Sequence, residues 1–299
     1  MTRHIAIVGC GHVGASLAQS LINKGAVCEL TLIDTNTRKV NSHALDLGDA
    51  LVALNEQVTI RVNDTAAMLS ADIIVVAIGP DEISSLDRLD EYTRNRAGII
   101  GLAHTLNAAA YDGIVLNITN PCDVITQILQ QASGLPTSRV FGTGTSLDTL
   151  RLKRMLGELL GVSPADVMGF VSGEHGDSQF IAWSSVRIVG QAVEQHLSAE
   201  LKAQLERQVT DVASEIYAGK QCTQFGIAAI ATNICQAILA NSKTIFSVSV
   251  YDAETGCYIS HPSQVGSFGL GKRFALKLSD SEQQKFNHSA DIIRQHVAS

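Results

Sequence analysis

The chain has 299 residues, of which 45% are hydrophobic and 17% are charged, and its formal net charge is −7. This length allows about two domains with buried cores, and this composition excludes an intrinsically disordered chain. Because basic residues are not clustered, we exclude partners that present a phosphate backbone or an acidic lipid surface, namely nucleic acids and membranes.

The sequence also contains no hydrophobic run of membrane-spanning length and no signal-peptide layout at its N-terminus. We therefore expect a cytoplasmic protein. The six cysteines form neither a CxxC pair nor the spacing of a metal site, so we expect no disulfide and no bound metal.

The first predicted strand, residues 5–8, leads into a glycine-rich turn and then a helix over 15–22. In a GxGxxG turn, the first glycine allows the tight turn, the second lets the backbone approach a pyrophosphate, and the third lets helix pack on strand. This context predicts a dinucleotide site at the helix N-terminus. The residues expected to bind cofactor here are Gly9, Gly11, His12, Val13 and Gly14.

A second predicted strand, residues 29–33, ends in Asp34, twenty residues after Gly14. A carboxylate at this place can accept hydrogen bonds from the adenosine ribose and would repel a 2′-phosphate. The sequence therefore predicts NAD as cofactor rather than NADP.

The next strands indicate a parallel sheet with both faces covered. A helix over 41–52 and a short strand at 58–60 precede residues 71–78, a continuous apolar run that ends before Gly79. We expect Gly79 to border the cofactor, since ligands bind at the carboxyl ends of such strands. The polar segment 80–88 that follows is predicted to act as a mobile lid.

Further along the chain, a helix over 89–110 and a strand over 113–119 lead to Asn120, which precedes a proline. Asn120 either makes the turn or contacts a ligand, and the sequence favours neither. After a helix over 124–132, a helix over 146–160 carries Asp148 and Arg151 on one face. These two form a surface ion pair, or each has a separate functional partner.

His175 lies between Gly173 and Gly176 in an acidic loop. Imidazole titrates near neutral pH, so His175 is a plausible proton carrier, although an isolated loop histidine is more often a solvated bystander.

Beyond this loop the composition changes. We predict a strand over 180–190, helices over 199–217, 227–240 and 279–297, and an antiparallel pair formed by 245–251 and 257–260. The predicted fold class is α/β, with a Rossmann-type doubly wound parallel sheet in residues 1–143 and a second α+β substrate domain in residues 144–299.

Taken together, the motifs resemble the L-lactate/malate dehydrogenase family over nearly the whole chain. Residues 119–126 and 178–184 are similar to the L-2-hydroxyisocaproate dehydrogenase branch, close to the L-lactate dehydrogenases. The motifs that carry the resemblance are Gly9-x-Gly11-x-x-Gly14, Asp34, Asp87-Arg88-Leu89, Thr119-Asn120-Pro121, Leu147-Asp148-x-x-Arg151 and Gly173-Glu174-His175-Gly176-Asp177-Ser178.

The resemblance implies a catalytic group of three residues. His175 would be the general acid or base, Asp148 would orient its imidazole, and Arg88 would polarise the substrate carbonyl.

The resemblance also implies which residues bind substrate. Arg151 would clamp the substrate carboxylate through two hydrogen bonds, assisted by Arg88. Asn120 would contact both the carbonyl and the nicotinamide side, and Thr223 and Glu82 would border the substrate. Around Thr223 the family pattern is poorer, because Gln221 and Cys222 replace a more usual Gly-Tyr.

The expected activity is an NAD-dependent L-2-hydroxy acid dehydrogenase acting on a monocarboxylic 2-oxo acid, either pyruvate or one like 2-oxoisocaproate. Malate dehydrogenase is disfavoured, because residues 80–87 contain three acids and no cation to hold a second carboxylate. An NAD- and metal-dependent glycosidase and a non-catalytic NAD-binding sensor are the competing hypotheses. The resemblance implies a homo-oligomer, either a tetramer or a dimer.

Overall fold

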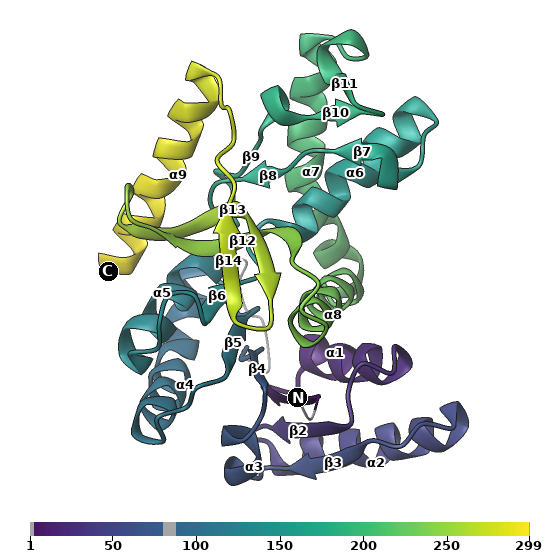
Figure 1. Ribbon diagram of the computed structural model, residues 1–299, viewed down its shortest axis with the longest axis vertical. Coiled ribbons are helices and arrows are strands. Elements are labelled where there is room, and N and C mark those ends of the chain that lie inside the picture. The colour runs from purple at the N-terminus through teal and green to yellow at the C-terminus, as the bar shows by residue number, and fades with distance from the viewer. Residues whose placement is uncertain (1–2, 80–87, 299) are drawn as a thin grey trace.

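The computed structural model describes residues 3–79 and 88–298, with the side chains of 88–92 and 94 excluded. Its centre is one nine-stranded sheet in the order β14-β13-β12-β6-β5-β4-β1-β2-β3, and Figure 1 shows helices on both sides of it.

Six of these strands are parallel and form one half of the sheet. Their order β3-β2-β1-β4-β5-β6 reverses direction between β1 and β4, where doubly wound folds open a ligand crevice. The predicted Rossmann-type α/β fold is therefore confirmed. The six strands are β1 (His4–Val8), β2 (Glu29–Ile33), β3 (Thr59–Val62), β4 (Ile73–Val76), β5 (Ile114–Asn117) and β6 (Val140–Gly142).

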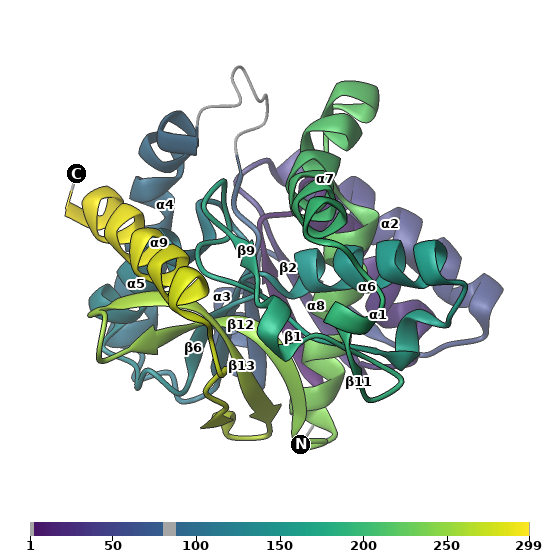
Figure 2. The same cartoon turned by 90° about the horizontal axis from the view of Figure 1, so that it is seen from above.

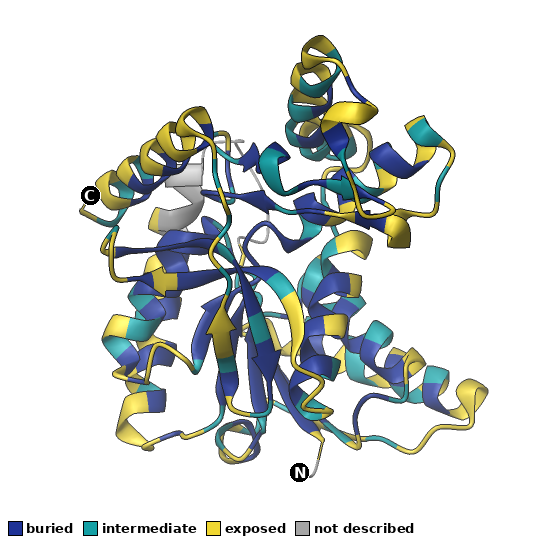
Figure 3. Cartoon of the chain, turned by 45° about the horizontal axis from the view of Figure 1, so that its top comes forward, coloured by how far each residue is buried: buried dark blue, intermediate teal, exposed yellow. Residues whose placement is uncertain are grey.

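The apolar pattern of the strands explains the two helical layers. In β1, Ile5 and Ile7 pack into one hydrophobic cluster, whereas Ala6 and Val8 pack into another on the opposite face. Side chains alternate across a strand, so a strand buried on both faces needs apolar residues throughout. In Figure 3 the strands of the sheet centre are mainly buried.

Helices α1, α2 and α8 contribute to the first cluster, and α4, α5 and α9 contribute to the second. The helices that the structure describes are α1 (His12–Asn23), α2 (Thr37–Leu54), α3 (Thr65–Leu69), α4 (Arg88–Ala108), α5 (Cys122–Ser133), α6 (Ser146–Leu160), α7 (Ala199–Lys220), α8 (Phe225–Leu239) and α9 (Asp280–Ala298). None of these described helices combines the length and hydropathy that a membrane span requires.

The sheet continues into the second half of the chain. Strand β12 (Thr244–Asp252) lies antiparallel to β6, with Ser249 opposite Gly142. It pairs in turn with β13 (Cys257–Gly266), and β13 pairs with β14 (Gly269–Arg273). The antiparallel pair predicted from the sequence is confirmed, and one sheet joins the two halves.

A separate lobe contains α6, α7 and a third hydrophobic cluster, in the upper right of Figure 1. Figure 2, which is viewed from above, shows α7 and α9 on opposite sides of the β9 region. The strands of this lobe have only two residues each. They are β7 (Val167–Met168), β8 (Val171–Ser172), β9 (Phe180–Ile181), β10 (Arg187–Ile188) and β11 (Gln191–Ala192).

The predicted continuous strand over 180–190 is wrong. Strand β9 ends at Ile181, and Trp183–Ser185 form a 3₁₀ turn before β10. The carboxylate of Glu282, on α9, accepts hydrogen bonds from the backbone N–H of Ser184 at 2.9 Å and from its hydroxyl at 2.5 Å. This long-range contact holds the turn, and no local pattern reveals it.

Candidate active site

A cavity of about 1240 Å³ lies at the carboxyl ends of β1, β2, β4 and β5. It is bordered by the β1–α1 turn, the end of β2, the segment after β4 and the segment after β5. From the second half of the chain it is closed by the β8–β9 loop, α7, the α7–α8 connection and α9. Of the residues predicted to bind cofactor, those that line it are Gly9, Gly11, His12, Val13, Asp34, Gly79 and Asn120.

The glycines of the glycine-rich turn are needed for two different reasons. A Cβ on Gly9, whose φ is +98°, would lie 2.3 Å from the carbonyl oxygen of Ala77, and one on Gly14 would lie 2.0 Å from that of Gly9. A Cβ on Gly11 would meet no atom within 4 Å. Gly9 and Gly14 are therefore required by packing, whereas Gly11 leaves the backbone open to the cavity. Such an open cradle at a helix N-terminus fits a pyrophosphate.

Asp34 is held at the edge of the same cavity. Its Oδ2 accepts the backbone N–H of Cys10 at 2.7 Å, and its Oδ1 accepts the N–H of Asn36 at 2.8 Å. Lys39 places its Nζ 3.4 Å from Oδ2. The carboxylate is thus fixed beside the glycine-rich turn, where it can accept hydrogen bonds from ribose hydroxyls. The residues present fit NAD.

His175, Asp148 and Arg151 are brought together by the start of α6 and the β8–β9 loop. The Nδ1 of His175 lies 2.9 Å from Oδ2 of Asp148, while Nη1 of Arg151 donates to Oδ1 at 2.8 Å. Asp148 is 1% exposed and Arg151 is 7% exposed. Asp148 and Arg151 therefore do pair with each other, but in the interior rather than at the surface, and the same carboxylate also contacts His175.

The electrostatics of Asp148 favour its ionised form. Burial acts to raise the pKa of Asp148, but the neighbouring His175 and Arg151 side chains outweigh that effect and lower the pKa below its usual value. A carboxylate that stays ionised can orient the imidazole through Nδ1 and stabilise its protonated form. Nε2 is then the ring nitrogen that does not contact Asp148, and it is the one that could transfer a proton.

The loop that carries His175 is supported by α9. Gly173 has a φ of +91°, and a Cβ there would lie 2.6 Å from Oγ of Ser289. Ser289 donates to the carbonyl oxygen of Ser178 at 2.7 Å, and Ser178 donates to Oε2 of Glu174 at 2.6 Å. Helix α9 therefore fixes the shape of a loop more than 100 residues earlier in the sequence.

The remaining predicted residues differ in where they lie. Asn120 and Thr223 line the cavity, whereas Gly14 packs behind the turn and Arg151 is buried. Arg88 begins α4, but its side chain lies outside the described residues, as does the whole of Glu82.

Sequence reasoning missed part of the cavity wall. Residues Ser214 and Tyr217 of α7 and Ile292 and His296 of α9 line the cavity. Their only sequence signal is a place on amphipathic helices, which does not reveal what those helices face. Within the described residues, no group of three His, Cys, Asp or Glu side chains is arranged to hold a metal ion.

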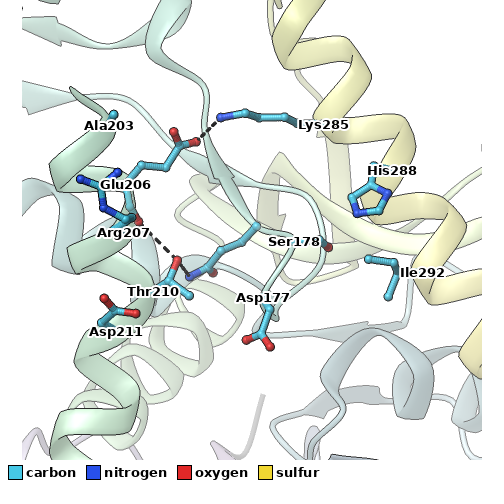
Figure 4. A pocket seen from close by; sticks show the side chains of 11 residues that line it. Asp177, Ser178, Ala203, Glu206, Arg207, Thr210, Asp211, Lys285, His288 and Ile292 are labelled. Carbon is cyan, nitrogen blue, oxygen red and sulfur yellow. Dashed lines mark hydrogen bonds and ion pairs between the residues drawn. The ribbon is translucent and has the colours of Figure 1, made fainter. Parts of the chain in front are cut away.

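A second pocket of about 580 Å³ lies between α7 and α9 and shares Asp177, Ser178 and Ile292 with the larger cavity. Figure 4 shows Glu206 of α7 and Lys285 of α9 facing each other across it, with Nζ and Oε1 2.7 Å apart. This ion pair links the two helices that close the cavity.

Comparisons with known proteins agree with this geometry. The family model described as lactate/malate dehydrogenase, NAD binding domain, matches residues 3–142, and that of the alpha/beta C-terminal domain matches residues 145–299. An L-lactate dehydrogenase 2 of Listeria innocua is 35% identical, with 99% of each chain covered. An L-lactate dehydrogenase 1 of Bifidobacterium longum is 36% identical, with 98% of this chain and 96% of the relative covered.

Two solved structures are similar over the same extent. The minor L-lactate dehydrogenase of Enterococcus mundtii in its ligands-bound form has a TM-score of 0.94 and 32% identity, with 99% of this chain and 98% of that chain covered. MGS-M5, a lactate dehydrogenase from a Medee basin deep-sea metagenome library, has a TM-score of 0.93 and 31% identity, with the same coverage.

Proposed function

This chain belongs to the lactate/malate dehydrogenase family and is an NAD-dependent L-2-hydroxy acid dehydrogenase, and on that premise we propose that it interconverts pyruvate and L-lactate. The names of its relatives support this choice among monocarboxylic substrates. A 2-oxo acid with a branched side chain, such as 2-oxoisocaproate, is the second candidate, supported by the resemblance of residues 119–126 and 178–184.

The observation that carries the proposal is the buried Asp148 carboxylate bonded to His175 beside a cavity that fits a dinucleotide. Bound NADH supplies the hydride for reduction of the 2-oxo carbon. In that direction His175 donates a proton to the developing alkoxide, and in the oxidative direction it accepts the hydroxyl proton. Asp148 stabilises the imidazolium while His175 carries the proton.

Arg151 is proposed to bind the substrate carboxylate. Its Nη1 is occupied by Asp148, and a guanidinium has further N–H groups that can form two parallel bonds to a carboxylate. Because the arginine is buried, such an ion pair would be strong. The aspartate also offsets the charge of the arginine when no substrate is bound.

The proposed roles of the other residues complete the site. Asn120 contacts the carbonyl and the nicotinamide side, and Thr223 borders the substrate, both from the cavity wall. Arg88 is proposed to polarise the carbonyl, and Glu82 to border the substrate side chain. The acids of residues 80–87 disfavour a dicarboxylate and so argue against malate dehydrogenase.

The test is NADH oxidation with pyruvate, 2-oxoisocaproate, phenylpyruvate and oxaloacetate, compared by kcat/KM. Pyruvate ahead of the others supports the proposal. Branched or aromatic acids ahead would make the enzyme a hydroxyisocaproate type, and oxaloacetate ahead would contradict the charge argument. A parallel series with NADPH checks Asp34, which should make NADPH the poorer donor.

We further propose a cytoplasmic homo-oligomer, a dimer or a tetramer. Leu45 and Val52 lie seven residues apart on one face of α2 and are 74% and 83% exposed, and Phe225 at the start of α8 is 70% exposed. Exposed apolar side chains that gather on one face mark a protein–protein contact, whereas isolated ones are normal, so the face of α2 that carries Leu45 and Val52 is the main support for this proposal. Light scattering after size exclusion measures the mass, and a Val52→Lys variant should lower it.

We also propose that the chain divides functionally at residues 143 and 144, into an NAD-binding part and a substrate part. The matched ranges of the two family models support this division.

A further inference from the structure

The part of the cavity wall that comes from α7 and the α7–α8 connection is polar. We call it the α7 wall, and its residues are Ala213, Ser214, Tyr217, Cys222, Thr223 and Gln224. All of them except the alanine carry a side chain that can form hydrogen bonds. The wall contributed by the parallel strands is different, since its lining includes Val8, Ile33, Ala77, Ile78 and Ile118. The two sides of the cavity therefore suit ligand parts of different polarity.

We propose that the α7 wall selects a hydroxylated substrate side chain. Among 2-oxo acids longer than pyruvate, the enzyme then prefers those that carry a hydroxyl group over apolar ones of equal size. This inference deepens the proposed function and rests on it, since it takes the reduction of 2-oxo acids by NADH and His175 as given. It argues against 2-oxoisocaproate, whose side chain is a branched hydrocarbon.

The positions of Ser214 and Tyr217 bring two hydroxyl groups to one side of the cavity. They lie three residues apart on α7 and therefore share a face of the helix. Ser214 is exposed and Tyr217 is half-buried, and both line the same cavity as Thr223. Because Thr223 is proposed to border the substrate, the two hydroxyls extend a polar surface from the substrate position along α7.

The α7–α8 connection sets the size of the wall next to Thr223. Cys222 donates from Sγ to Oε1 of Gln224 at 3.2 Å, and both side chains line the cavity. Cys222 stands where the family pattern has a tyrosine, and a thiol is much smaller than a phenol. The wall beside Thr223 therefore leaves room for a side chain longer than the methyl group of pyruvate.

Hydroxyl groups on a wall select a substrate through desolvation. An apolar side chain that covers a hydroxyl removes its water and offers no partner, whereas a substrate hydroxyl replaces that water. Alcohols and phenols both donate and accept hydrogen bonds, so they can pair with a substrate hydroxyl in either sense. A site built to bind a substrate hydroxyl can reject the analogue that lacks it by up to about 10⁴–10⁵-fold.

The charges around the cavity favour a neutral polar side chain over a second carboxylate. None of the side chains of the α7 wall is cationic, and the β8–β9 loop adds the acids Glu174 and Asp177 to the cavity lining. A carboxylate on the substrate side chain would meet no cation on this wall and would be repelled by these acids. A hydroxyl group needs no counter-charge.

The experiment compares hydroxypyruvate with 2-oxobutyrate, which has a methyl group where hydroxypyruvate has the hydroxyl. The kcat/KM of each is measured at saturating NADH for wild type, Tyr217→Phe, Ser214→Ala and the double variant. Each substitution removes a hydroxyl group and little else. The ratio of the two kcat/KM values within one protein cancels any change in the folded fraction.

The matched control is Tyr251→Phe on β12. Tyr251 is 43% exposed and is not among the described residues that line the cavity. This variant loses the same phenolic hydroxyl as Tyr217→Phe, so it should keep the wild-type ratio.

We expect wild type to prefer hydroxypyruvate by about 10-fold or more. Either single substitution should lower this ratio by about 2- to 10-fold, the usual contribution of one hydrogen bond, and the double variant should bring the ratio near one. A wild-type ratio of one or less would overturn the inference. So would a ratio that neither substitution changes, because the preference would then arise from the reactivity of hydroxypyruvate itself.

A second readout does not depend on turnover. L-glycerate and L-2-hydroxybutyrate, the corresponding 2-hydroxy acids, bind the enzyme–NADH complex without reacting, and NADH fluorescence reports their dissociation constants. L-glycerate should bind more tightly in wild type, and this advantage should shrink in both variants. Equal or weaker binding of L-glycerate would contradict the role of the α7 wall. Wild type that reduces no 2-oxo acid would count against the proposed function, while the binding ratio would still decide the role of the wall.

Discussion

The two sides of the active site are held in shape by different interactions. On the cofactor side, parallel strands of three to five residues share continuous backbone ladders and are buried between helices. On the histidine side, β8 and β9 have two residues each, and side-chain hydrogen bonds replace the ladder. Shape is thus maintained locally in the first region and by distant partners in the second.

Strand β8 shows how distant partners hold the histidine side in shape. The carbonyl oxygen of Val171 accepts hydrogen bonds from Thr145 at 2.6 Å and from Ser247 at 2.7 Å, and Ser172 donates to the carbonyl oxygen of Ser260 at 2.7 Å. These partners lie 26, 76 and 88 positions away. Small hydroxyl residues from three elements therefore fix the base of the histidine loop.

The largest effect should come from His175→Asn, which removes the proton carrier and leaves the cofactor side intact. General acid–base groups contribute about 10²–10⁴-fold, so kcat should fall by that factor. NADH titration by fluorescence should give an unchanged dissociation constant. Turnover within tenfold of wild type would mean that another group moves the proton.

Next in size is a pair of glycine variants that separates packing from binding on the cofactor side. Gly9→Ala should destabilise the protein by about 2–4 kcal/mol, because it adds backbone strain at positive φ to a clash with Ala77. Gly11→Ala, with open space around its Cβ, should keep the melting temperature and weaken NADH binding. Equal melting temperatures for the two variants would contradict the assignment of packing to Gly9.

A smaller effect concerns His261 on β13, whose two ring nitrogens are buried without partners in the described part of the chain. Burial, assisted by Arg273, lowers the pKa of His261 to about 4, and the ring packs against Phe286 with centroids 5.0 Å apart. The folded pKa lies below the unfolded value of about 6.5, so stability is lost as pH falls from about 6.5 toward 4.

His261→Phe should remove this acid-dependent loss, which is worth about 2 kcal/mol between pH 7.5 and pH 5. Urea denaturation of both proteins at the two pH values measures it. If wild type and the variant lose the same stability on acidification, other groups account for the loss.

The smallest effect should come from Ser247→Ala, which removes one of the hydroxyls under β8. The Ser247 hydroxyl donates to the carbonyl oxygen of Val171 and is also hydrogen-bonded to the hydroxyl of Thr145, so its loss should lower stability by about 1.5 kcal/mol. Because β8 positions the histidine loop, kcat should fall as well. Ser242→Ala, at an exposed turn, is the control and should change stability by less than about 0.5 kcal/mol. An equal loss of stability in Ser247→Ala and Ser242→Ala would contradict the conclusion that distant hydroxyl groups hold the histidine side in shape.

The sequence predicts the locally held cofactor side better than the histidine side, which depends on distant partners. Strand β2 and helix α6 have the bounds 29–33 and 146–160 that their hydrophobic patterns predict. Asp34 lines the cavity beside the glycine-rich turn, and Asp148 contacts His175, as the motifs imply. In these cases the informative residues are near one another or belong to motifs of fixed spacing.

The failures lie where distant side chains decide the structure. The 3₁₀ turn after β9 is held by Glu282, and the backbone N–H of His175 donates to the carboxylate of Asp123 on α5. Neither acid has a local pattern that names its partner, so periodicity and spacing could not predict the contact. The sequence also left open whether Asp148 and Arg151 pair at the surface, because it does not show that α6 is covered by elements later in the chain.

The pairing of β6 with β12 has a consequence for synthesis on the ribosome. Strand β6 ends at Gly142 and β12 begins at Thr244, so about 100 residues are translated between them. At about 5–20 residues per second, the nascent sheet presents an uncovered β6 edge for roughly 5–20 s. Such an edge can pair with other chains, so nascent chains on one polysome are exposed to misassembly during this interval.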